Sequence, residues 1–98
     1  MLETEEYWGT LAQLASSIIS KKSTYEDLWE HMFVKGTSYQ YLTLHHSHNS
    51  SAIADSIELI PTSPPGGWYE TLKQICFYAV REDIKDMIRR RGLDPDNF

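Results

Sequence analysis

The segment from Pro61 to Gly67 (PTSPPGG) restricts most strongly what this chain can fold into. Proline fixes one backbone angle and lacks an amide donor, whereas glycine adopts backbone angles that other residues avoid. Neither a helix nor a strand can therefore continue through this segment, and the chain must turn a corner here. Trp68 follows at once and opens a stretch with the apolar spacing of a helix.

Before the corner, apolar residues recur at spacings of three and four, which is the pattern of helices that bury one face. The spacing predicts a helix over residues 4–20, followed by Lys21 and Lys22, whose charges suit the negative end of the helix dipole. A second helix is predicted to begin at the capping-box pattern of residues 23–26 and to stop near Gly36.

Residues 37–46 (TSYQYLTLHH) fit two kinds of element. The alternating tyrosine and threonine side chains favour a strand. A single strand would have nothing to pair with, however, because no second strand or hairpin turn is evident elsewhere. We therefore expect a short helix. Another helix follows, capped by Asn49, Ser50 or Ser51 and ended by Pro61.

Beyond the corner, an apolar face begins at Trp68 and continues to the arginine run at 89–91, where Gly92 ends it. The spacing leaves open whether residues 68–91 form one helix or two. Taken together, the patterns predict an all-α fold over residues 1–98, a compact antiparallel bundle of five or six short helices. We expect a single interaction domain, placed at the amino terminus of a longer protein.

Composition and charge argue against several functions. The 98 residues carry a formal net charge of −5, which disfavours direct binding of nucleic acid, because phosphates are bound by clustered lysine and arginine. The acidic start MLETEE is unlike a signal peptide, and no apolar run is long enough to span a bilayer. We therefore expect a cytoplasmic protein that does not insert into membranes.

No arrangement of residues indicates catalysis or a cofactor. His45, His46 and His48 could in part face one metal ion, but no cysteine or carboxylate ligand lies nearby in sequence, so a solvated loop is favoured. The single cysteine, Cys76, lies on an apolar helix face, where a small buried side chain is expected rather than a nucleophile. We expect a protein that is not an enzyme and holds neither metal nor cofactor.

Charge is unevenly distributed along the chain. Glutamates and aspartates crowd the first third, whereas the last predicted helix ends in arginines. This polarity fits contacts between copies of the protein, and it fits a merely solvated surface equally well.

Several positions on either side of the corner form a more specific pattern. They are Ile53, Gly67, Trp68, Tyr69, Glu70, Thr71, Leu72, Ile75, Ala79, Ile84 and Met87. This pattern resembles helices four to six of caspase-recruitment domains, a branch of the death-fold superfamily, in which a Gly-Trp pair commonly opens the fifth helix. Within the branch it is most similar to the domains of cytoplasmic viral-RNA sensor helicases and of their mitochondrial antiviral adaptor.

The resemblance implies six short helices and a protein that binds other copies of the same fold, often in filaments that recruit an effector in innate immune or antiviral signalling. The contact residues that it implies are Trp68, Gly67, Glu26, Asp27, Glu30, Lys21, Lys22, Arg89, Arg90 and Arg91. Trp68 has a second interpretation, as a core residue that begins a helix. The whole chain also has a second interpretation: it could be a small acidic inhibitor of a basic enzyme, such as an immunity or antitoxin protein.

Overall fold

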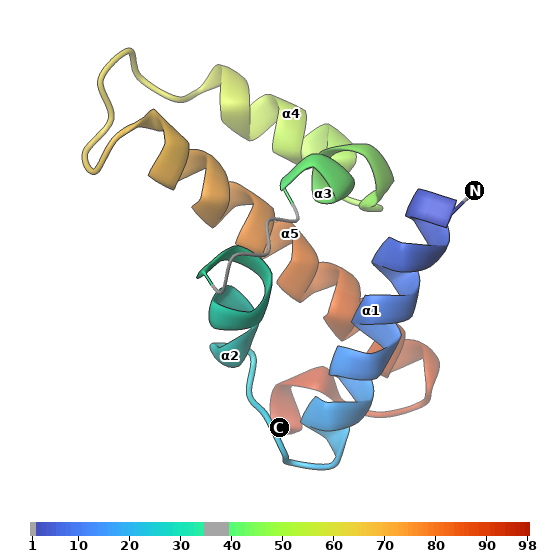
Figure 1. The fold of residues 1–98 in the computed structure, drawn as a ribbon. Coiled ribbons are helices and arrows are strands. Elements are labelled where there is room, and N and C mark those ends of the chain that lie inside the picture. The colour runs from blue at the N-terminus through green and yellow to red at the C-terminus, as the bar shows by residue number, and fades with distance from the viewer. Residues whose placement is uncertain (1, 35–39) are drawn as a thin grey trace.

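The computed structural model describes residues 2–34 and 40–98, and the described residues contain helices and no strand (Figure 1). In chain order the elements are α1 (Leu2–Ile19), α2 (Asp27–Trp29), the π-helical turn η1 (Glu30–Val34), α3 (Gln40–His46), α4 (Ser50–Glu58), α5 (Trp68–Arg90) and the 3-10 turn η2 (Pro95–Asn97). The predicted all-α bundle is therefore confirmed.

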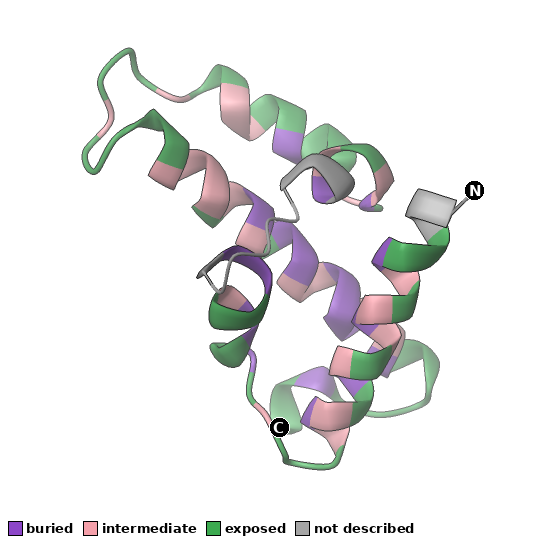
Figure 2. Ribbon diagram, in the orientation of Figure 1, coloured by how far each residue is buried: buried purple, intermediate pink, exposed green. Residues whose placement is uncertain are grey.

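The core lies where α1, α2 and the adjoining turn η1 pack against α5. Helix α1 contributes Tyr7, Leu11, Ala15 and Ile18, and α5 contributes Cys76, Val80, Ile84 and Ile88. Leu28 and Met32 close the core from α2 and η1. The buried residues of α1 and α5 recur every three or four positions, so each helix turns one continuous stripe inward and leaves the other side in water (Figure 2).

The boundaries before the corner agree with the sequence pattern to within a few residues. Helix α1 ends at Ile19, and Lys21 then takes a left-handed conformation with φ 61°, which terminates the helix. The helical interpretation of residues 37–46 is confirmed for Gln40–His46, while residues 37–39 lie outside the described residues. The predicted stop near Gly36 also lies outside them.

The caps of two helices differ from the prediction. In the turn before α2, the Thr24 amide donates to Oδ2 of Asp27 at 2.8 Å, one residue later than the pattern of residues 23–26 implies, and the N-cap residue Glu26 makes no side-chain capping bond. Ser23 Oγ is buried and has no hydrogen-bond partner in the described structure. Asn49 does precede α4, but its side chain makes no capping hydrogen bond and is used elsewhere.

Helix α5 is one uninterrupted helix of 23 residues, which answers the question that the spacing left open. Neither glycine nor proline occurs between Trp68 and Arg90, so nothing in the chain breaks the hydrogen-bond ladder. At about 1.5 Å per residue the helix is about 35 Å long. The separate fifth and sixth helices implied by the resemblance are not present, and every other α-helix packs along this one (Figure 1).

Candidate interaction surfaces

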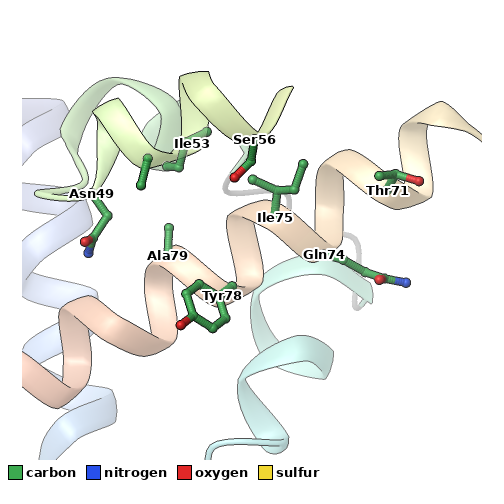
Figure 3. A pocket seen from close by; sticks show the side chains of 9 residues that line it. Asn49, Ile53, Ser56, Thr71, Gln74, Ile75, Tyr78 and Ala79 are labelled. Atoms are coloured by element: carbon green, nitrogen blue, oxygen red, sulfur yellow. The ribbon is translucent and has the colours of Figure 1, made fainter. Parts of the chain in front are cut away.

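An open, mostly apolar groove lies between α4 and α5, with a volume of about 300 Å³ (Figure 3). The α4 side is lined by Asn49, Ala52, Ile53 and Ser56, and the α5 side by Thr71, Gln74, Ile75, Tyr78 and Ala79. Both sets follow helical spacing, so the groove is formed by one continuous stripe of each helix. Ile53 and Ala79 are buried at its base, and Tyr78 is 61% exposed at its edge.

Two exposed apolar side chains, Leu59 and Trp68, lie beyond the lining residues in the direction of the corner. Leu59, which is 83% exposed, lies three residues after Ser56, and Trp68, which is 47% exposed, lies three residues before Thr71. Residues three apart occupy the same side of a helix. The interpretation of Trp68 as a core residue is therefore wrong, because almost half of the side chain faces water. Its role in a partner contact stays a prediction.

Gly67 shapes this corner through its backbone. It precedes the first residue of α5 with φ 94°, a conformation that side chains disfavour, and Gly66 has φ 80°. The Gly67 carbonyl accepts hydrogen bonds from the Thr71 amide at 3.2 Å and the Thr71 hydroxyl at 3.0 Å. The structure thus gives this predicted contact residue a conformational role, which is to let Trp68 begin the helix directly after the turn.

A buried polar cluster fixes the other end of the groove. The Tyr7 hydroxyl donates to Oδ2 of Asp83 at 2.7 Å, and Nδ2 of Asn49 donates to Oδ1 of the same carboxylate at 2.9 Å. Asp83 is fully buried, and its two bonds tie α1 and the start of α4 to the middle of α5. Burial, followed by the nearby Asp83 charge and the hydrogen bond to it, raises the pKa of Tyr7 well above its ordinary value.

Sequence reasoning missed this cluster. Asn49 is assigned there to a helix cap, and Tyr7 is taken for an ordinary apolar position. One signal was available in the pattern: Asp83 lies three residues after Val80 and directly before Ile84, within the stripe of α5 that faces the core. A carboxylate in such a stripe must find hydrogen-bond donors when the stripe is buried.

The structure divides the predicted charged residues between two surfaces. Glu26, Asp27 and Glu30 are all exposed, at the residue before α2, the start of α2 and the start of η1, and we call them the acidic face. Lys21 and Lys22 follow α1, and Arg91 Nη1 lies 3.3 Å from Ser16 Oγ near the end of the same helix. The carboxyl ends of α1 and α5 therefore lie together (Figure 1), and this basic end comprises Lys21, Lys22, Arg89, Arg90 and Arg91.

Two members of these surfaces also serve the fold. Arg89 pairs with Asp86 at 2.6 Å, which offsets part of its charge, and Asp27 accepts the Thr24 amide at the start of α2. Trp68 and the basic end lie at opposite ends of α5, so one compact contact cannot include both. The predicted contact residues thus belong to three regions of the molecule: the corner with Gly67 and Trp68, the acidic face and the basic end.

Cys76 occupies the buried position that the sequence predicts. The solvated loop predicted for the histidines is wrong for two of them, because His45 and His46 form the last residues of α3. Cys76 is fully buried in the core, and burial raises the pKa of its thiol to about 11, so little reactive thiolate forms near neutral pH. His48 stacks on Trp8 with ring centroids 4.3 Å apart, while His46 lies 6.4 Å from the Tyr7 ring. Within the described residues, no three histidine, cysteine or carboxylate side chains are placed to hold a metal ion.

The described residues form an all-α helical bundle with an apolar groove between α4 and α5 and with exposed acidic and basic regions. Comparison with known protein families, with curated proteins and with solved structures finds no match to this chain. No helix in the described part of the chain is both long and apolar enough to span a membrane.

Proposed function

We propose that this chain is a protein-interaction domain that acts by binding, not by catalysis, and that it assembles with other copies of its own fold. The observation that carries the proposal is the separation of charge: the acidic face on α2 and the basic end of α1 and α5 are both exposed. Opposite charges on different parts of one surface favour contacts in which the acidic face of one copy meets the basic end of the next.

The resemblance to caspase-recruitment domains extends this proposal to a biological setting, cytoplasmic assembly in innate immune or antiviral signalling. Domains of that kind work through surface patches and without a cofactor. The continuous α5 departs from the six-helix pattern of the family. The proposal therefore relies on the exposed charges and the exposed corner tryptophan, and not on the helix count.

A charge reversal on the acidic face tests self-assembly. The best positions are Glu26 and Glu30, because Asp27 also accepts the Thr24 amide and its loss would remove that hydrogen bond from the turn before α2. In the variant carrying Glu26→Lys and Glu30→Lys, the weight-average mass from light scattering should stay that of a monomer across a concentration series. The wild type should grow with concentration at low salt and less so at physiological salt, where charges are screened over about 8 Å.

The control changes net charge equally on another helix. Asp55 and Glu58 are exposed on α4, so Asp55→Lys with Glu58→Lys should assemble as the wild type does. Mixing the acidic-face variant with one carrying Arg90→Glu and Arg91→Glu should restore assembly, because each then offers a complementary surface. A wild type that is monomeric throughout, or an acidic-face variant that assembles normally, would contradict the proposal.

A second candidate function is an acidic inhibitor of a basic enzyme, and the net charge of −5 favours it. Such an inhibitor predicts a wild type that stays monomeric in the same light-scattering series and forms a salt-sensitive one-to-one complex with a basic protein. The concentration series thus separates the two candidates.

A further inference from the structure

Assembly through the charged regions leaves the groove between α4 and α5 unoccupied. We propose that this groove is a separate docking site for an amphipathic helix of a different protein, one whose apolar stripe is flanked by lysine or arginine. The proposal does not depend on self-assembly, because the groove shares no residue with the acidic face or the basic end.

The shape of the groove suits a helix. Its walls are two helix stripes with small side chains on both sides, among them Ala52, Ser56 and Thr71, which let another backbone approach (Figure 3). From Asn49 to Ser56 the α4 wall covers seven residue steps, or about 10 Å, which matches about two turns of a docked helix. An amphipathic helix of that length offers apolar side chains at the spacing of these walls.

Exposed apolar side chains in the groove and beyond its end provide anchors. Tyr78 lines the groove with 61% of its surface exposed, and Leu59 and Trp68 are exposed beyond the end nearest the corner. Tyrosine and tryptophan are enriched among the residues that contribute most to binding, because they bury a large apolar area and lose little conformational freedom.

The charges around the groove select the partner. Asp55 lies one helical turn from Ala52, Glu70 one turn from Gln74 and Glu82 one turn from Tyr78, so each acidic residue adjoins a lining residue. Residues 47–70, which include all of α4 and the corner, contain no lysine or arginine. A helix entering the groove therefore meets negative charge on its flanks, which lysine and arginine would complement.

Cations of α5 lie close to two of these carboxylates. Lys73 pairs with Glu70 at 3.8 Å and lies over the Tyr69 ring at 5.1 Å. The Arg81 guanidinium lies 5.7 Å from the centre of the Tyr25 ring, which belongs to the segment before α2. Glu82 pairs with Lys85 at 4.0 Å, so the charges of Glu70 and Glu82 are partly offset. The negative flank of the groove is therefore provided mainly by Asp55 on α4, in the segment 47–70 that lacks lysine and arginine.

A second copy of this chain does not supply such a helix from its described residues. The apolar stripes of α1 and α5 are already buried in the core, and α4 carries two acidic residues and no basic one. The occupant is therefore assigned to another protein, and the groove would link that protein to any assembly built through the charged regions.

The test uses two labelled synthetic helices titrated with the full chain and followed by fluorescence anisotropy. Both carry leucine at every third or fourth position over about four turns; one has lysine on the flanks of the stripe and the other has glutamate. We expect the lysine peptide to bind at least about tenfold more tightly at low salt, with the difference shrinking as salt is added. Equal binding of the two peptides, or binding of neither, would overturn the proposal.

Two variants of the chain locate the site. Ser56→Arg places a bulky cation inside the groove, whereas Ser51→Arg adds the same charge at an exposed position of the same helix that does not line it. The first should weaken binding of the lysine peptide by about tenfold or more and the second by less than about twofold. Equal losses would also overturn the proposal, provided circular dichroism shows both variants folded.

The same Ser56→Arg variant distinguishes this inference from the proposed function. Its light-scattering series should match that of the wild type, because Ser56 belongs to neither charged region. If the wild type binds the peptide but does not self-assemble, the docking site is supported and the proposed function is contradicted. If it self-assembles but does not bind the peptide, the proposed function is supported and the docking site is contradicted.

Discussion

Replacing Asp83 by alanine is expected to lower the free energy of unfolding by about 2–4 kcal/mol, because one buried and one partly buried donor then lose their acceptor. The Tyr7 hydroxyl and the Asn49 amide both bond to this carboxylate, at 2.7 and 2.9 Å. The alanine also leaves a cavity in a fully buried position. Urea denaturation followed by circular dichroism measures the change.

Two further variants separate hydrogen bonding from volume. Asp83→Asn keeps the shape and one acceptor oxygen and should be less destabilising than Asp83→Ala. Tyr7→Phe removes one donor and leaves the carboxylate bonded to Asn49, so it should lower the free energy of unfolding by about 1–2 kcal/mol. Tyr7 and Asp83 are in contact. The variant carrying both Tyr7→Phe and Asp83→Ala should therefore lose less free energy of unfolding than the sum of the two single variants. Additive losses would mean that the bond does not contribute.

The raised pKa of Tyr7 gives the same cluster a signature in pH. Its ordinary value is 10.0, which applies to the unfolded chain, and the folded value is higher, so the folded state retains a proton that the unfolded state releases. The stability that this provides is fully present below about pH 10 and is lost as pH rises above it. Tyr7→Phe should therefore show a smaller loss of stability between about pH 9 and about pH 11 than the wild type. An unchanged pH dependence would indicate that Tyr7 is not the group responsible.

The sequence was sufficient for features that depend on local spacing. Apolar residues every three or four positions predicted α1 and α4, and the corner of prolines and glycines located the turn before α5. The sequence was not sufficient where two local patterns were equally possible and tertiary packing determined which of them formed. Both Ser23 to Glu26 and Thr24 to Asp27 have the spacing of a capping box. In the folded chain the hydrogen bond forms between Thr24 and Asp27.

The candidate site was harder to predict, because it depends on distances between segments that are far apart in the chain. Trp68 lies on the apolar side of its helix, and that spacing alone suggests burial. In the structure α5 extends past the end of α4 at Glu58, so the first turn of α5 has little to pack against and Trp68 is left half exposed (Figure 1). Likewise, nothing local pairs Asp83 with a tyrosine 76 residues earlier.

The continuity of α5 leads to the other large expected effect. Proline at position 82 would remove a backbone hydrogen bond inside the helix and place its ring against the carbonyl of residue 78. Glu82→Pro should therefore lower the free energy of unfolding by about 3 kcal/mol or more, as measured by urea denaturation. If the chain instead contained two helices that meet between Val80 and Ile84, as in the family that it resembles, proline at their junction would be tolerated.

Glu82→Ala is the appropriate reference, because it removes the same side chain and keeps the helix. It also removes the ion pair with Lys85, whose nitrogen lies 4.0 Å from the Glu82 carboxylate, and a partly exposed pair of this kind contributes less than about 1 kcal/mol. If the free energy of unfolding of Glu82→Pro lies within about 1 kcal/mol of that of Glu82→Ala, a continuous α5 is contradicted. Such a small difference would favour the six-helix arrangement and with it the proposed homotypic assembly. With a large difference, the proposal of homotypic assembly is supported by the charged surfaces alone.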